Sequence, residues 1–295
     1  MVSLARTKAE KKRAKAGTIF AYSRLDAFLV LVTGIQLALI LWGLLNFSRL
    51  SLAGLALFLL AHVLVSVTNY NTAAHNFVHS PFFVSRRLND LYAALCGITV
   101  MLPFTLLSLY HMEHHQYGND RKDAATGTTK DSTSTYLYGK DGGHEALWRY
   151  SFLSQLRDWA AIAATFKAAR QSRERVRIAV EAAVIAVFWA ALFWVNWRFA
   201  LFYILVVYLS LVATTAQNYF EHYGARPGSR KTDSVSCYNP IYNFLWFNNG
   251  YHQEHHFRAG VHWTRLKELR SEMLPEDERR VVRGAHFMNL PWLAR

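Results

Sequence analysis

Four long apolar stretches dominate the pattern of hydrophobic and polar positions along this chain. They cover residues 26–47, 51–67, 179–197 and 199–217. A helix of roughly 20 mostly apolar residues crosses the hydrocarbon core of a bilayer. The second stretch reaches that length only by including the residues up to Ala74. The pattern therefore predicts an all-α integral membrane helix bundle with about four transmembrane helices.

A fifth apolar stretch, residues 91–109, is interrupted by Gly97 and Pro103. Proline in a helix interior removes a backbone hydrogen bond and kinks or ends the helix. The stretch could therefore span the membrane, re-enter it or lie buried in the protein. Only a segment that does not cross leaves the polar residues on its two sides at the same membrane face.

Composition and charge agree with a membrane protein and suggest its orientation. The chain has 295 residues, of which 52% are hydrophobic and 15% aromatic, and its formal net charge is +13. The basic residues lie in 1–25, 75–177 and 221–295, apart from Arg49 and Arg198. If the fifth stretch does not cross, the positive-inside rule places both termini in the cytoplasm. We interpret the basic charge as membrane orientation and contact with anionic lipids. Nucleic-acid binding is not expected, because no recognition motif accompanies it.

Three regions follow from this organisation. We expect a basic cytoplasmic tail over residues 1–25, a membrane catalytic domain over 26–265 and a cytoplasmic C-terminal tail over 266–295. Residues 263–283 have the composition of a charged, soluble helix. The N-terminus does not have the pattern of a cleavable signal peptide, because the first apolar stretch is too long. Two distant cysteines, Cys96 and Cys237, suggest neither a disulfide framework nor a thiolate metal site.

The histidines are distributed unevenly, and nine of the 13 fall into four short clusters. The clusters are HNFVH with His75 and His79, HMEHH with His111, His114 and His115, NYFEH with His222, and HQEHH with His252, His255 and His256. Residues three and four apart share one face of a helix, and imidazole is a ligand for iron, zinc, copper or nickel. The spacing therefore predicts a metal site at one face of the bundle, the cytoplasmic face in the orientation above.

The other four histidines are interpreted without metal. His62 lies inside an apolar stretch, where a hydrogen-bonded bundle residue is the simpler explanation. His144, His262 and His286 lie in polar or irregular segments and are taken as ordinary surface histidines.

The number of clustered histidines constrains the metal. Structural zinc takes four ligands, and catalytic zinc takes three with water in the fourth place. One zinc would leave about half of the cluster unused, whereas two metals with four or five nitrogens each would use it. Iron suits such a site when open positions remain for oxygen. A di-zinc hydrolase stays open as an alternative.

These motifs carry a family resemblance. The order HNFVH, HMEHH, HQEHH resembles the three histidine boxes of the membrane fatty acid desaturase and hydroxylase superfamily, and NYFEHYG at 218–224 is similar to the signature of bacterial alkane 1-monooxygenases. The resemblance implies two irons held by the nine clustered histidines, with Asn218 reaching one iron through water. Two details depart from these relatives. HNFVH has a three-residue gap, unlike acyl-CoA desaturases, and HMEHH lacks the extra residue of the alkane monooxygenase box.

The resemblance also implies a reaction. We expect a membrane-bound, non-haem di-iron oxidoreductase that uses O2 and electrons to oxidise unactivated C–H bonds of a lipid acyl chain by fatty acid desaturation. Such bonds have no acidic proton, so a metal must supply the oxidant. Hydroxylation of a fatty acid or alkane is the first alternative, followed by alkene-forming decarboxylation and by a membrane zinc hydrolase. Electrons would come from a separate ferredoxin, rubredoxin or cytochrome, and a bacterial inner membrane is the expected location.

Four acidic residues near the boxes are further candidates. Glu113 and Glu254 occupy equivalent places in HMEHH and HQEHH. Each is expected either to accept a hydrogen bond from a ligand histidine of another cluster or to be a solvated helix charge. Asp120 and Asp123, in the GNDRKD segment, are interpreted as loop-forming residues rather than histidine partners.

Overall fold

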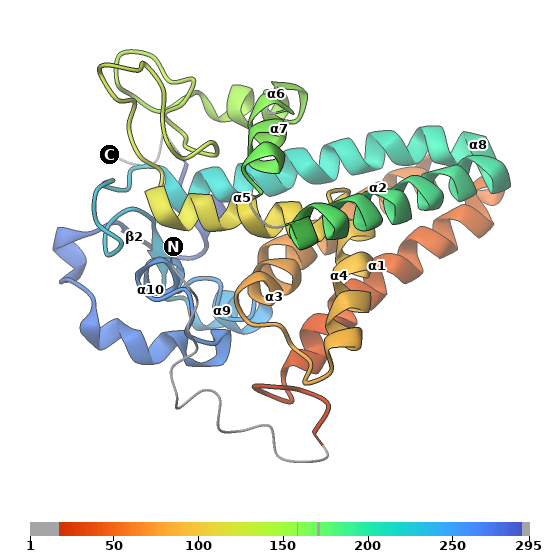
Figure 1. The fold of residues 1–295 in the computed structure, drawn as a ribbon, viewed down its shortest axis with the longest axis horizontal. Helices are drawn as coiled ribbons and strands as arrows, with labels where there is room; N and C mark the ends of the chain where they lie inside the picture. Colours follow the sequence, from red (N-terminus) through yellow and green to blue (C-terminus); the bar gives the residue numbers. More distant parts are fainter. Residues whose placement is uncertain (1–17, 158, 170–171, 291–295) are drawn as a thin grey trace.

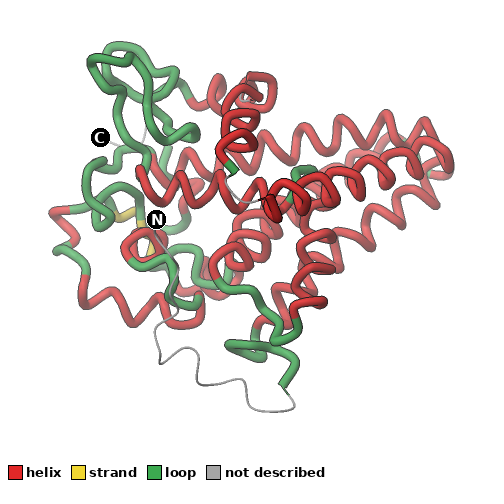
Figure 2. Tube along the Cα trace, in the orientation of Figure 1, coloured by secondary structure: helices red, strands yellow, loops and turns green. Residues whose placement is uncertain are grey.

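A computed structural model describes residues 18–157, 159–169 and 172–290 of this protein, which form a helix bundle with very little strand (Figures 1 and 2). Of the predicted N-terminal tail, residues 1–17 lie outside the described residues. The α-helices are α1 (Asp26–Asn46), α2 (Leu52–Thr68), α3 (His75–His79), α4 (Arg86–Val100), α5 (Phe104–Tyr117), α6 (Leu147–Arg157), α7 (Trp159–Ala168), α8 (Ser172–His222), α9 (Pro240–Leu245) and α10 (His252–Phe257). A π-helix, η3 (Asn69–Ala74), joins α2 to α3. The predicted all-α membrane fold is confirmed.

Four membrane crossings follow from three long apolar helical segments. These segments are Asp26–Arg49, Leu52–His79 and Ser172–His222. The last one reverses at Asn196, whose φ of −157° and ψ of 89° are not helical. As a result, the rings of Trp189 and Tyr203 lie 5.7 Å apart, whereas 14 residues of straight helix would separate them by about 21 Å. The two arms of α8 are therefore the predicted third and fourth crossings.

The two hairpin turns lie at the same end of the bundle (Figure 1). Phe47, in the turn after α1, packs its ring 5.8 Å from that of Phe199 and 5.6 Å from that of Phe202, just after the reversal of α8. Arg49 and Arg198 thus belong to neighbouring turns, as expected from the distribution of basic residues.

The fifth apolar stretch forms the bent pair α4 and α5, whose axes meet at 79°. Pro103 precedes the first turn of α5, and Met101 has a left-handed φ of 57°. The chain enters this pair after His79, and the Nε2 atom of His111 on α5 lies 2.9 Å from His79 Nε2. Both ends of the pair therefore lie at the histidine end of the bundle, which agrees with a re-entrant segment.

A buried polar hub joins the helices that position the histidines. Asn69 accepts a hydrogen bond from Thr33 on α1 (2.7 Å) and donates to Gln36 on α1 and Thr99 on α4, both at 2.9 Å. Each partner would lose its hydrogen bond in a buried site if Asn69 were apolar. The hub therefore links α1, η3 and α4 just before the first histidine cluster.

The C-terminal segment differs from its prediction. Instead of one charged helix over 263–283, the chain forms the 3-10 helices η4 (Trp263–Glu272) and η5 (Glu276–Glu278) and the strand β2 (Val281–Val282), which pairs in parallel with β1 (Ser236–Cys237). A further 3-10 helix, η6 (His286–Met288), follows, and an earlier one, η2 (Phe47–Arg49), lies in the turn after α1. Pro275 lies at the break between η4 and η5. A proline at this position argues against one continuous helix, and the sequence prediction did not use it. Trp263, Leu266 and Leu269 are buried in the same core as the residues around α3.

Candidate metal centre

Four helices bring the nine clustered histidines to one end of the bundle. They are α3, α5, the end of α8, and α10, with the loops gathered around them (Figures 1 and 2). The π-helix η3 directly precedes His75. Such helices widen one turn and are frequent at functional sites. The structure thus assembles four sequence segments that lie up to 180 residues apart.

The first cluster contains five histidines: His75, His79, His111, His115 and His255. One nitrogen atom from each lies within 4.8 Å of those of the others. The Nε2 atoms of His75 and His255 are 2.7 Å apart, those of His79 and His111 are 2.9 Å apart, and those of His115 and His255 are 3.0 Å apart. Five ligand atoms therefore face a common point.

The second cluster contains His114, His222 and His256, all buried. His252 joins it, because its Nε2 atom is 3.4 Å from His222 Nε2. The rings of His115 and His256 have centroids 4.5 Å apart, so the two clusters are neighbours. The nine predicted residues thus divide into a group of five and a group of four.

The chemistry of this donor set fits metal ions. Burial lowers the pKa values of His252, His255 and His256 well below their ordinary range, and neighbouring histidines lower them further. These rings are therefore neutral, which is the form that binds metal. His256 Nε2 is buried without a hydrogen-bond partner, a costly arrangement for a polar atom. A cation between the rings would use these lone pairs.

Carboxylate and carbonyl oxygens hold the outer nitrogens of the second cluster. Asp131 lies 2.8 Å from His114 Nδ1, and the Asp233 backbone oxygen lies 3.0 Å from His222 Nδ1. An Asp233 carboxylate oxygen lies 3.2 Å from His256 Nδ1, but the two atoms do not form a hydrogen bond. Partners of this kind orient a ligand ring and set its tautomer. Burial acts to raise the pKa of Asp131, but His114 and hydrogen bonds outweigh it and lower the value to about 2.

Sequence reasoning missed these two aspartates. Asp131 lies 17 residues after His114, and the Asp233 backbone contact spans 11 residues. Both are in loops, where no periodic spacing marks a partner. No local pattern could have identified them.

Glu113 and Glu254 do not bind histidines as predicted. Glu113 accepts a hydrogen bond from Ser132 Oγ at 2.7 Å. Glu254 is 0% exposed and accepts from Ser236 Oγ at 2.7 Å and from Tyr238. Neighbouring helix positions point about 100° apart, and hydroxyl groups outside the helices occupy the directions in which these glutamates point. The predicted histidine contact is therefore wrong for both, and Glu254 is not a solvated charge either.

The loop interpretation of Asp120 and Asp123 is confirmed. Asp120 accepts hydrogen bonds from the backbone N–H groups of Lys130 and Asp131, each at 2.9 Å. Asp123 accepts from the N–H groups of Ala125 and Thr126. Asp120 thereby holds the loop segment that presents Asp131 to His114.

Of the four histidines outside the clusters, one has the predicted environment, one does not, and two are intermediate between surface and core. His62 is buried and lies 3.2 Å from both Ser210 Oγ and Tyr203 OH, as expected for a bundle residue. His286 is fully buried beside Glu221 and is not a surface residue. His144 and His262 are half-buried, and each has hydrogen-bond partners.

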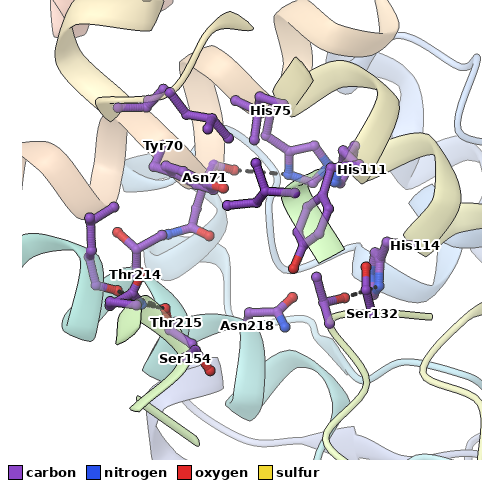
Figure 3. Close-up of a pocket in the computed structure, with 18 of the residues that line it drawn as sticks. Tyr70, Asn71, His75, His111, His114, Ser132, Ser154, Thr214, Thr215 and Asn218 are labelled. Atoms are coloured by element: carbon purple, nitrogen blue, oxygen red, sulfur yellow. Dashed lines mark hydrogen bonds between the residues drawn. The ribbon is translucent and has the colours of Figure 1, made fainter. Parts of the chain in front are cut away.

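A cavity of about 230 Å³ opens onto both clusters (Figure 3). Its end at the clusters is formed by His75, His111, His114 and His252. Much of its wall is apolar, with contributions from Val78, Val100, Met101, Leu102, Leu106, Leu107, Ile162 and Leu211. Asn218 also lines it and donates to Tyr150 OH at 2.7 Å. An apolar chain entering this cavity would reach the histidines.

Comparisons with known proteins agree with this site. The family model for fatty acid desaturases matches residues 49–286, which include all nine clustered histidines. A sphingolipid delta(4)-desaturase of Schizosaccharomyces pombe is 27% identical over 245 residues, covering 78% of this chain. The match covers 64% of that relative, so the chain spans less than two thirds of its length. The family match extends over most of the sequence, and the chain belongs to the fatty acid desaturase family.

Proposed function

We propose that this protein is a membrane-bound di-iron oxidoreductase that desaturates the acyl chain of a lipid. The observation that carries the proposal is the convergence of nine histidine nitrogens in two adjacent clusters beside an apolar cavity. Membership of the desaturase family supports the reaction class. Bound iron would activate O2 and so supply the oxidising power toward C–H bonds that amino-acid side chains lack.

The ligand set favours iron over zinc. Five nitrogens face one another in the first cluster, one more than the four ligands typical of zinc. Iron accepts a larger number of histidine ligands and can react with O2. A zinc hydrolase also needs a way to activate water beside its substrate, whereas the cavity wall here is largely apolar.

The protein residues position the substrate rather than react with it. Leu106, Leu107 and Val78 line the cavity beside the histidines and would exclude water from an acyl chain. Asn218, at the same cavity, is proposed to hold a water molecule toward the second cluster. An acyl carbon held against His75 and His252 would lie between the two groups of ligands.

Desaturation is preferred over hydroxylation because of the relative's activity. The Schizosaccharomyces pombe protein is a sphingolipid delta(4)-desaturase, and we propose a lipid with a long alkyl chain as the substrate here. Hydroxylation of a fatty acid or alkane, and alkene-forming decarboxylation, use the same C–H bond and are separated by their products. Electrons are proposed to arrive from an external ferredoxin, rubredoxin or cytochrome at the cytoplasmic face of a bacterial inner membrane.

Metal analysis with an activity assay tests this proposal. Protein purified without oxygen should bind two irons per chain and should require O2 and a reductant to convert a lipid. His255→Ala, which removes a ligand of the first cluster, should lose iron and turnover together. Full activity with zinc and well under two irons would contradict the proposal.

A further inference from the structure

The two histidine clusters are unequal in their number of nitrogens. The first contains five histidines, whereas the second contains His114, His222 and His256 with His252 at its edge. Non-haem iron sites commonly combine histidine with carboxylate ligands. An oxygen ligand from the protein would bring the second cluster to five donors, and a buried glutamate lies at its edge.

Glu221 lies at the edge of the second cluster where His252 joins it. Its side chain is buried, with 3% of the residue exposed, and it lines the cavity together with His252. Its Oε2 atom is 3.8 Å from His252 Nε2, the nitrogen that faces His222. Glu221 Oε2 is thus on the same side as the ligand nitrogens.

The two oxygens of Glu221 have different surroundings. Oε1 accepts hydrogen bonds from Gln217 Nε2 at 2.8 Å and from Asn249 Nδ2 at 2.7 Å, and His286 Nδ1 lies 3.5 Å away. Oε2 receives no hydrogen bond from the described residues. Oε2 is not fully buried, and Glu221 lines the cavity, so a cation in the cavity could reach this oxygen. The donors on Oε1 therefore aim a bare oxygen at the cluster.

A second buried glutamate on the same helix shows the contrast. Glu181 is 7% exposed, and both of its oxygens are satisfied by Thr105, one by the backbone N–H at 2.7 Å and the other by the hydroxyl at 2.9 Å. A glutamate whose role is to hold helices together uses both oxygens in this way. Glu221 does not.

We infer that Glu221 is a tenth protein ligand, which binds the metal of the second cluster through Oε2. The inference rests on the proposed metal pair and goes beyond its nine histidines. It makes the two metal sites chemically different, one with five nitrogens and the other with four nitrogens and a carboxylate oxygen. The buried side chains of Gln217, Asn249 and His286 would then act as positioning residues for this ligand.

Iron titration and Mössbauer spectroscopy of full-length protein loaded with ⁵⁷Fe(II) test the inference. Glu221→Gln keeps the size of the side chain but removes its charge, and Glu181→Gln is the matched control. In Glu221→Gln we expect one of the two irons to bind at least about 10-fold more weakly, with its signal lost or shifted and the other signal unchanged. Glu181→Gln should match the wild type in both readouts.

The outcomes of these experiments separate the possible failures, and a second variant covers misfolding. If wild-type protein does not bind two irons, the proposed metal pair itself is refuted. If the wild type binds two irons and Glu221→Gln binds both with unchanged affinity and signals, Glu221 is not a ligand. Should Glu221→Gln not fold without metal, Glu221→Asp provides the second variant, because it keeps the charge but withdraws the oxygen by one bond. An unchanged second signal in folded Glu221→Asp also overturns the inference.

Discussion

Asp131 provides the sharpest test of how the protein supports the second histidine cluster. Its Oδ2 atom lies 2.8 Å from both His114 Nδ1 and the backbone nitrogen of Asn119. Its Oδ1 atom accepts from the backbone N–H of Thr133 at 2.8 Å and from the Thr133 hydroxyl at 2.6 Å. Both oxygens therefore face two donors each. In Asp131→Asn, either orientation of the new amide directs its NH2 group at a backbone N–H, that of Asn119 or that of Thr133.

The cost of this substitution follows from these contacts. A hydrogen bond to a charged group contributes about 1.5–3 kcal/mol, so the loss of one hydrogen bond from a backbone N–H gives a destabilisation of about that size. Loss of the oxygen that orients a ligand histidine typically weakens metal binding by about 10–100-fold. We expect Asp131→Asn to lower the melting temperature and to weaken the second metal site.

Thermal unfolding with and without added iron, together with metal competition, measures both effects. Asp123→Asn is the control, since Asp123 is exposed in the same loop and caps only a local turn. It should leave metal affinity unchanged. Wild-type affinity at both metal sites in a folded Asp131→Asn variant would refute the assigned role of Asp131.

Three other predictions follow from the same contacts. His111→Ala should reduce bound iron and abolish turnover, as measured by metal analysis and lipid conversion, because His111 Nε2 faces His79 Nε2 at 2.9 Å; wild-type iron content would contradict its assignment as a ligand. Asn69→Ala should destabilise the protein by about 3 kcal/mol, about 1 kcal/mol for each of three buried hydrogen bonds, and an unchanged melting temperature would contradict the hub. Gly118→Ala should disturb the second cluster, because Gly118 has a φ of +53° and a Cβ there would lie 2.3 Å from Asp233 Oδ2; unaltered iron binding would show that the loop adapts.

The spacing of the histidines along the sequence made the metal site predictable. The contacts between these histidines and residues of other segments could not be predicted from that spacing. A ligand pair such as His111 and His115 lies on one helix face and is visible as a motif. The carboxylates beside other clustered histidines come from loops: Asp131 lies beside His114 and Asp233 beside His256, and no periodic pattern connects them. Glu113 and Glu254 occupy equivalent positions in their motifs, which made them candidate partners of the histidines. Their carboxylates instead accept hydrogen bonds from Ser132 and Ser236.

Helix boundaries show the same limit. Hydrophobic length predicted the crossings, including the hairpin that the structure places at Asn196. The C-terminal segment was misjudged because charge suggested solvent, while Leu266 and Leu269 pack into the core. His286 was misjudged for the same reason, since only the fold brings Glu221 and Tyr242 next to it. Glu221, by contrast, directly precedes the clustered residue His222, so its place near the histidines could have been predicted from the sequence.

Mass spectrometry of lipids from cells that express the protein under ¹⁸O2 tests the central claim most directly. The His255→Ala variant is the control. The wild-type chain should produce a lipid that has lost two hydrogens and carries no ¹⁸O, and the control should not produce it. A product that gains ¹⁸O would make the protein a hydroxylase, and an unchanged lipid pool with iron-loaded wild-type protein would contradict lipid oxidation altogether.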